Sequence, residues 1–511
     1  MIEAVRRVIV AAAVSVLVGC GGGGGSDNNP APPPTTFSDP VAYSSAAEAS
    51  LPTAAEFAAV TRHQLAIDGA TLPYTATAGH LTARNPASGA AEASFFYVAY
   101  TLDNAAAAQR PVTFFYNGGP GSATAWLHLG SFGPMRLVTG DPSTAATAFP
   151  LVPNPHSLLD VSDLVFVDAV GTGFSEAVAP NTNSTFWGVD ADALVFRDFV
   201  MRYLAANNRG VSPKFLFGES YGTTRSAVLA NVLETAGVDL DGVVLQSSIL
   251  NYGSNCGVVF NANCMGFLPS YAATGAWYGL DNPNPAPADL PQYLLQARTL
   301  AATQYGPAVA QFMTTHAPPS TALLTTLVDT TGLALANWQA HFNMASQTYQ
   351  RNLIPGTLIG LYDARVSTPV NNALARAGDP SSTFFEGGFA SAVPAYLATL
   401  NYTTPSTYVL LGNAIQTWNF RHDGVAVPDT IPDLASAMAQ NPQLRVLSVN
   451  GYHDLVTPFF QTELDLGRLD PGSNVETRFY VGGHMTYLDE TSIALEKADL
   501  KAFYAGATGS P

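Results

Sequence analysis

The chain has 511 residues, well above the roughly 250–300 residues at which a single hydrophobic core stops growing, so we expect one large domain with an insertion, or two domains. Its 38 Asp and Glu residues outnumber 21 Lys and Arg residues and give a formal net charge of −17. This acidic balance excludes nucleic acid as an expected partner, and also electrostatic docking on an anionic membrane.

The first residues have the pattern of an export signal. Arg6 and Arg7 precede an apolar run over residues 8–18, which is too short to span a bilayer. The run ends in Leu-Val-Gly-Cys, similar to a bacterial lipobox, and predicts a signal peptide over residues 1–19 and a lipid on Cys20. An ordinary signal peptide with an incidental cysteine is the alternative.

Residues 20–37 are rich in Gly and Pro, a composition that favours a tether over a packed core. A tether next to a lipid anchor predicts an exported protein, held on a bacterial membrane and facing the periplasm or the exterior. The lipid is the one membrane contact that we expect. The oligomeric state is left open.

Residues 38–250 are predicted to form the first part of an α/β core, in which strands alternate with helices. Gly69 and Gly79 are interpreted as breaks after the first strand. The predicted strands are residues 63–67, 95–101, 112–116, 164–167, 214–217 and 242–250, and the predicted helices are residues 190–205 and 223–236. This alternation implies a mostly parallel sheet that is covered on both faces.

The alternation stops over residues 251–424, which we interpret as a mainly helical cap insertion with helices at 291–305 and 319–336. Cys256 and Cys264 are predicted to form a disulfide, because an exported chain meets an oxidising compartment. Neither a metal site nor a cofactor is expected. The core resumes over residues 425–511, with predicted strands at 445–449 and 477–481 and a helix at 492–504.

A candidate nucleophile lies between a predicted strand and a predicted helix. Residues 218–222 read GESYG, and a G-x-S-x-G sequence in this context predicts a nucleophile elbow that exposes Ser220. The tight turn needs glycines on both sides because larger side chains would not fit. The alternative is a loop serine with two chance glycines.

The partners of such a serine follow from chain order, which in an α/β-hydrolase runs Ser, acid, His. His484, directly after the last predicted strand, is the candidate base, and Asp454, after the strand at 445–449, is the candidate orienting acid. Asp168 also ends a strand but precedes the serine. A glycine-rich turn at residues 117–121 (NGGPG) can expose N–H groups, so Gly119 and Tyr221 are the predicted oxyanion donors.

Taken together, these motifs resemble the serine carboxypeptidase family, peptidase family S10. The matching segments occur in family order at residues 117–121, 154–157, 168–175, 218–222, 450–454 and 483–485. The resemblance implies an α/β-hydrolase fold with a helical cap, and removal of C-terminal residues from peptide substrates through an acyl-enzyme. The alternatives are an esterase or acyltransferase on the same scaffold, and a catalytically dead, lipid-anchored binding protein.

The resemblance also implies how a terminal carboxylate is bound. The family uses an asparagine, a glycine N–H and a pair of glutamic acids, and Asn117, Gly118 and Glu219 stand at matching places. Ser131 occupies the place of the second glutamic acid. We expect Arg136, five residues later, to supply a charge-assisted contact instead. A solvated loop arginine is the alternative.

Overall fold

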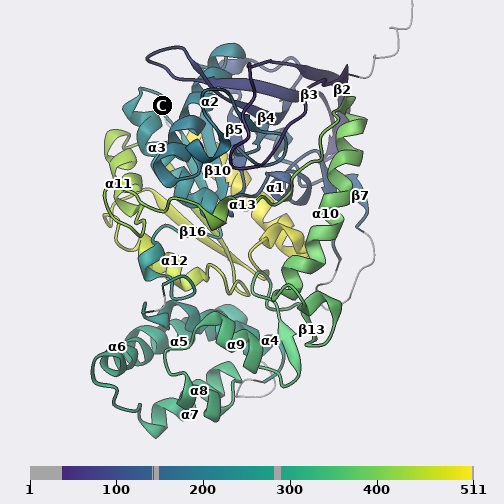
Figure 1. Ribbon diagram of the computed structural model, residues 1–511. Helices are drawn as coiled ribbons and strands as arrows, with labels where there is room; N and C mark the ends of the chain where they lie inside the picture. The colour runs from purple at the N-terminus through teal and green to yellow at the C-terminus, as the bar shows by residue number, and fades with distance from the viewer. Residues whose placement is uncertain (1–36, 141, 143–148, 260, 281–288, 509–511) are drawn as a thin grey trace, which may run out of the picture. The chain divides into compact units, whose positions relative to one another are not determined.

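The structure, a computed structural model, describes residues 37–140, 142, 149–259, 261–280 and 289–508 (Figure 1). The predicted signal peptide, Cys20 and all of the predicted tether except Phe37 lie outside these residues. Within the described part of the chain, no helix combines the length and the apolar character needed to cross a membrane.

Ten strands of the described residues form the main sheet, in the order β16-β15-β11-β10-β5-β8-β4-β3-β2, with β9 paired to β4 (Figure 1). Their bounds are β2 (Ala58–Ile67), β3 (Ala70–Arg84), β4 (Ala91–Leu102), β5 (Val112–Tyr116), β8 (Asp163–Val167), β9 (Glu176–Ala177), β10 (Lys214–Glu219), β11 (Gly242–Gln246), β15 (Arg445–Gly451) and β16 (Val475–Tyr480). The strands from β16 to β8 pair in parallel, and β4, β3 and β2 are antiparallel. The inverted order of β5 and β8 and the parallel run identify the α/β-hydrolase fold.

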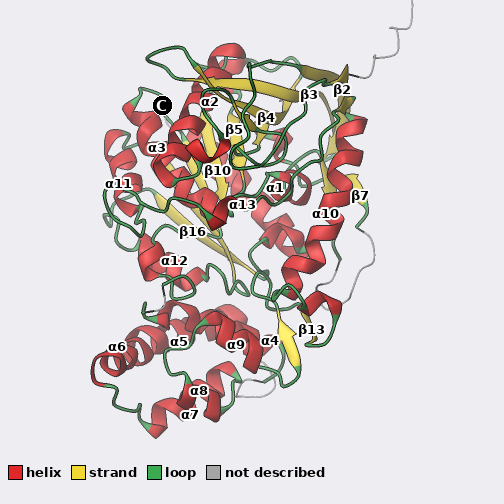
Figure 2. Cartoon of the chain, in the orientation of Figure 1, coloured by secondary structure: helices red, strands yellow, loops and turns green. Residues whose placement is uncertain are grey.

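Helices cover both faces of this sheet because successive strand residues point to opposite sides. Phe114 and Leu216 pack in the core shared with α2 (Val189–Ala206), α3 (Tyr221–Thr235) and α11 (Ile431–Gln440). Their neighbours Phe115 and Phe217 pack in the core shared with α1 (Ala125–Gly130), α10 (Pro380–Thr399) and α13 (Glu490–Thr508) (Figure 2). The sheet is thus buried on both sides, as parallel sheets generally are.

A helical insertion separates β11 from β15 and has a hydrophobic core of its own (Figure 1). Its helices are α4 (Leu268–Trp277), α5 (Leu290–Leu300), α6 (Gly306–Thr315), α7 (Thr321–Thr331), α8 (Leu335–Ala340) and α9 (Ser346–Asn352). They share this core with α12 (Phe459–Leu466). α10 belongs to the same stretch of sequence but packs on the sheet. Short strands complete the fold: β1 (Phe37–Ser38), β6 (Met135–Leu137), β7 (Leu151–Pro153), β12 (Thr357–Ile359), β13 (Ser367–Pro369) and β14 (Tyr402–Thr403).

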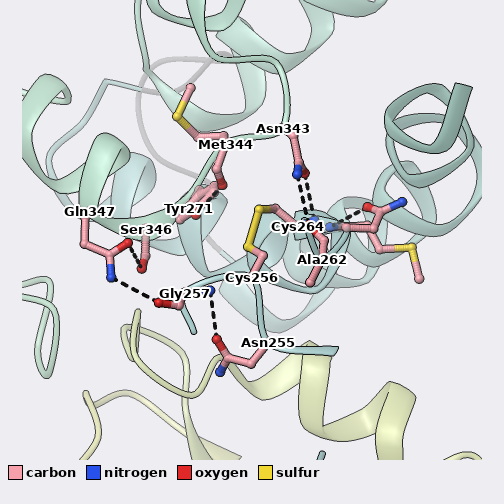
Figure 3. The surroundings of a disulfide bond; sticks show 12 residues. Asn255, Cys256, Gly257, Ala262, Cys264, Tyr271, Asn343, Met344, Ser346 and Gln347 are labelled. Atoms are coloured by element: carbon pink, nitrogen blue, oxygen red, sulfur yellow. Dashed lines mark hydrogen bonds between the residues drawn. A yellow bond between two sulfur atoms is a disulfide. The ribbon is translucent and has the colours of Figure 1, made fainter. Parts of the chain in front are cut away.

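A disulfide joins Cys256 and Cys264 at the start of this insertion, with Cα atoms 5.3 Å apart (Figure 3). Asn343 braces the loop that the disulfide closes: its side chain accepts a hydrogen bond from the Cys264 N–H and donates one to the carbonyl of Ala262, both at 2.9 Å. Both cysteines are buried in the core of the insertion. The disulfide therefore closes a loop that is anchored in the core of the insertion.

Two local sequence interpretations are wrong. Gly79 is not a break but lies inside β3, which pairs with β2 and β4 along its length. A Cβ at Gly79 would collide with the carbonyl of Phe57, so the glycine permits a close backbone approach. The helix predicted over residues 319–336 is divided into α7 and α8 by Gly332, whose φ of +71° ends α7 in a left-handed turn.

Candidate active site

Ser220 occupies a strained turn between β10 and α3. Its φ and ψ are 60° and −127°, a conformation that costs a non-glycine residue free energy and is typical of functional turns. The glycines beside it are required by packing: a Cβ at Gly218 would collide with the carbonyl of Gly222, and a Cβ at Gly222 would lie 2.8 Å from the carbonyl of Tyr116. This geometry is that of the predicted nucleophile elbow.

Asp454 and His484 meet at the same edge of the sheet, on the loops that follow β15 and β16. The His484 Nδ1 lies 2.7 Å from the Asp454 Oδ2, and the two side chains are 2% and 0% exposed. Asp454 is itself fixed, because its Oδ1 accepts the N–H groups of Val456 and Thr457 and its Oδ2 accepts the Thr457 hydroxyl. An Nδ1–H donated to Asp454 leaves the His484 Nε2 as a hydrogen-bond acceptor.

The electrostatic setting of His484 suits a base. Burial by itself lowers the pKa of the imidazole. The charge of Asp454 and the hydrogen bond to it, together with the other nearby carboxylates, raise the pKa by more than burial lowers it, so the net pKa lies above the usual value. Its Nε2 is buried and makes no hydrogen bond to any of the described residues. A proton arriving at Nε2 would therefore be stabilised by Asp454.

Ser220 and His484 both border a cavity of about 60 Å³. Ser220, His484, Asn117, Gly118, Gly119 and Glu219 line it together with apolar side chains that include Trp126, Phe385, Leu411 and Met485. A Cβ at Gly118 would collide with the backbone nitrogen of Tyr221, so the glycine turn lies directly against the elbow. Tyr221 is the first residue of α3, where N–H groups lack acceptors within the helix. N–H groups so placed can stabilise an oxyanion.

Glu219 is a buried carboxyl group in the wall of this cavity. Its Oε1 accepts the Asn117 Nδ2–H at 2.8 Å, and its Oε2 accepts the Tyr487 hydroxyl at 2.5 Å. Burial raises the pKa of Glu219 to about 7, although the charge of His484 and the hydrogen bond from Tyr487 each oppose the rise. Near neutrality this group therefore changes between a hydrogen-bond donor and a carboxylate.

Other predicted residues lie elsewhere. Arg136, on β6, donates to Glu490 at the start of α13 and is not among the described residues that line the cavity. Ser131 turns its hydroxyl back to the carbonyl of Leu127 at 2.5 Å. Asp168 accepts hydrogen bonds from the Thr124 N–H and the Tyr408 hydroxyl. It therefore stabilises the end of the loop that contains the glycine turn.

Two tyrosines that contact residues of the cavity wall were not identified from the sequence. The Tyr362 ring stands edge-on to the His484 ring, with ring centroids 4.9 Å apart. The backbone carbonyl of Tyr362 accepts a hydrogen bond from the backbone N–H of His484 at 2.6 Å. Tyr362 comes from the insertion, where no motif marked it. Tyr487 is three residues after His484, and this proximity was the one available signal.

One of the solved structures to which the chain is similar supports the fold. Kex1(delta)p, a prohormone-processing carboxypeptidase from Saccharomyces cerevisiae, is similar with a TM-score of 0.52 and 16% identity, over 84% of this chain and 91% of that one. Proline iminopeptidase from Mycobacterium smegmatis has a TM-score of 0.34 and 14% identity, over 88% and 100% of the two chains. No curated protein matches the sequence. Residues 68–253, which include the elbow and the glycine turn, match the family described as serine carboxypeptidase.

Proposed function

We propose that the protein is a serine hydrolase in which Ser220, His484 and Asp454 form the catalytic triad. The observation that carries the proposal is the state of the His484 imidazole. Its Nδ1 is hydrogen-bonded to Asp454, and its Nε2 makes no hydrogen bond to any of the described residues. The imidazole lines the same cavity as Ser220. Ser220 Oγ attacks the carbonyl carbon and its proton passes to His484 Nε2. The N–H groups of Gly119 and Tyr221 bind the oxyanion.

The first half-reaction ends when His484 gives its proton to the leaving amine, which departs and leaves an ester on Ser220. In the second half-reaction, water attacks this ester while His484 accepts a proton from the water. His484 then returns the proton to the Ser220 Oγ as the carboxylic acid leaves, and Ser220 is regenerated. Asp454 keeps the imidazole in the required tautomer and stabilises its cation in both steps.

The proposed substrates are peptides, cleaved one residue at a time from the carboxyl end. The family match over residues 68–253 supports this choice, as does the presence of Asn117, Gly118 and Glu219 in one cavity wall. The protonated carboxyl group of Glu219 and the Asn117 amide can donate hydrogen bonds to a terminal carboxylate. Arg136 has no part in this proposal, since its guanidinium pairs with Glu490.

The test compares one N-blocked dipeptide with its methyl ester and its amide. A carboxypeptidase cleaves the free-acid dipeptide, whereas an esterase cleaves the ester alone. A binding protein without activity cleaves none of the three. A fluorophosphonate probe should label Ser220, and Ser220→Ala should remove both labelling and turnover; labelling of another residue would contradict the assignment.

We also propose that the protein is exported and held on a bacterial membrane by a lipid on Cys20, with the insertion acting as a cap over the cavity. The lipobox-like sequence and the Gly/Pro-rich segment support the anchor. Mass spectrometry of the membrane-extracted protein should find a diacylglyceryl group on Cys20. Recovery of a chain whose first residue lies beyond Cys20 would contradict this.

A further inference from the structure

The Tyr487 hydroxyl completes the hydrogen bonding of Glu219. It donates to Oε2 at 2.5 Å, while Asn117 donates to Oε1 at 2.8 Å. Tyr487, Asn117 and Glu219 are 0%, 2% and 4% exposed. Each oxygen of the carboxylate thus has a protein donor, and water has little access to replace either one.

The fold makes room for this tyrosine. Tyr487 lies in a short 3-10 helix (Thr486–Leu488) directly after the His484 loop, and its ring packs against the end of α1. A Cβ at Gly130 would lie 2.8 Å from the Tyr487 Cε2, so the absence of a side chain at Gly130 admits the ring. The next residue, Ser131, directs its hydroxyl into its own helix. Tyr487 is therefore the partner that reaches Glu219.

Several ionisable groups act on Glu219 from the surrounding elements. The charge of His484 lowers its pKa and the charge of Asp454 raises it, after the larger effect of burial. Glu496 on α13 and Tyr362 from the insertion also interact with it. Burial holds the pKa of Tyr487 well above its usual value, so its hydroxyl stays protonated. Of the two hydrogen-bonded groups Glu219 and Tyr487, only Glu219 changes its charge near neutral pH.

We propose that Tyr487 is the positioning residue of Glu219: its hydroxyl holds the carboxylate as an acceptor and so sets the pH above which the cavity no longer binds a substrate carboxylate. This inference rests on the proposed carboxypeptidase function. When Glu219 is ionised, it repels a terminal carboxylate; when it is protonated, it donates to one. The tyrosine stabilises the ionised form, because a hydroxyl can donate to a carboxylate without losing its own proton.

The variant Tyr487→Phe removes this donor and keeps the ring. Because the hydroxyl stabilises the ionised carboxylate, its loss should raise the pKa of Glu219 by about one unit or more. With a free-acid dipeptide, the alkaline limb of kcat/KM should move up by the same amount. At pH values well above the midpoint of the parent's alkaline limb, the kcat/KM of the variant should be about tenfold higher than that of the parent. Loss of a structural contact alone would lower activity at every pH.

Tyr480→Phe is the matched control. The Tyr480 hydroxyl also donates to a carboxylate, Asp499, at 2.7 Å, but Asp499 is outside the set of described residues that line the cavity, whereas Glu219 is within it. Its pH profile should follow the parent. The ester of the dipeptide has no carboxylate to be repelled, so its alkaline limb should not move in Tyr487→Phe.

A direct titration separates this inference from the proposed function. In the Ser220→Ala background, infrared difference spectra follow the C=O band of protonated Glu219, assigned by its loss in Glu219→Gln. Tyr487→Phe should move the midpoint of that band to higher pH. An unchanged midpoint overturns the inference, even if peptides are cleaved. A shifted midpoint without cleavage of any peptide sustains the role of Tyr487 and overturns the carboxypeptidase assignment.

Discussion

A buried ion pair beneath the cavity should be needed for the rate as well as for stability. The Arg225 Nε donates to the Asp192 Oδ2 at 2.7 Å, and the two side chains are 0% and 3% exposed. The Arg225 Nη1 also donates to the carbonyl of Asn117 at 2.8 Å, while Asp192 accepts the Tyr221 hydroxyl at 3.2 Å. The pair therefore holds the glycine turn and the first residue of α3, which supply the proposed oxyanion donors.

Arg225→Met should lower the free energy of unfolding by about 3–5 kcal/mol, because it leaves the Asp192 carboxylate buried without its partner. The double variant Asp192→Leu/Arg225→Met should regain most of this stability, since replacing both members of a buried pair with apolar residues is often neutral or stabilising. It should not regain the rate. A misplacement of about 1 Å can cost about 10²-fold, and we expect a loss of this order in kcat/KM.

The assay measures urea unfolding and ester hydrolysis on the same preparations. An ester is suitable because it requires the oxyanion donors but not the carboxylate contacts of Glu219. Arg209→Met is the control: Arg209 pairs with Asp163 in the buried interior and is not one of the described residues that line the cavity, so the variant should lose stability without losing rate per folded molecule. A double variant with both the parent's stability and the parent's rate would refute the reasoning.

Three further outcomes are expected. Asp454→Asn should lower kcat by about 10⁴-fold, the size of effect in the Ser-His-Asp template, while the melting temperature of Asp454→Asn separates this loss from misfolding. Gly118→Ala should abolish ester hydrolysis, because its Cβ collides with the Tyr221 nitrogen; parental kinetics would show that the turn can move away freely. Replacing Cys256 and Cys264 with Ser should cost about 2–3 kcal/mol of unfolding free energy, as the chain-entropy estimate gives for so short a loop; an unchanged urea midpoint would argue against the staple.

The catalytic constellation was predictable because local pattern and chain order constrain it together. β5 occupies residues 112–116 as predicted, and the strand predicted at 214–217 is the first part of β10. Parallel strands place their carboxyl ends at one edge, so loops after β10, β15 and β16 must lie near each other. Ser220, Asp454 and His484 follow those strands, and this is why residues far apart in sequence could be grouped without coordinates.

Elements made by tertiary packing were not predictable in the same way. β3 contains several Ala residues, Pro73 and Gly79, which are depleted in strands, and its pairing with two neighbours outweighs this weak propensity. α10 contains Gly387, Gly388 and Pro394, residues that disfavour a helix interior. It forms nonetheless because Phe385, Phe389 and Val393 repeat at helical spacing and are buried in the core of the sheet.

The contacts of Glu219 were also not predictable from the sequence, because they too depend on tertiary packing. A missing acid at Ser131 suggested a replacement cation, and Arg136 was the nearest one in the sequence. In the fold, Arg136 is neutralised by Glu490, while the space beside Gly130 is filled by a tyrosine from the His484 loop. Residues 130 and 487 carry no shared pattern, since their contact depends on the path of α1 relative to α13. The proposed partner of Glu219 is thus a neutral donor, and in the proposed carboxypeptidase the recognition of a carboxylate depends on the protonation of Glu219 and not on a fixed positive charge. The proposal therefore predicts an alkaline limit on peptide cleavage that moves in Tyr487→Phe, and an alkaline limit on ester cleavage that does not.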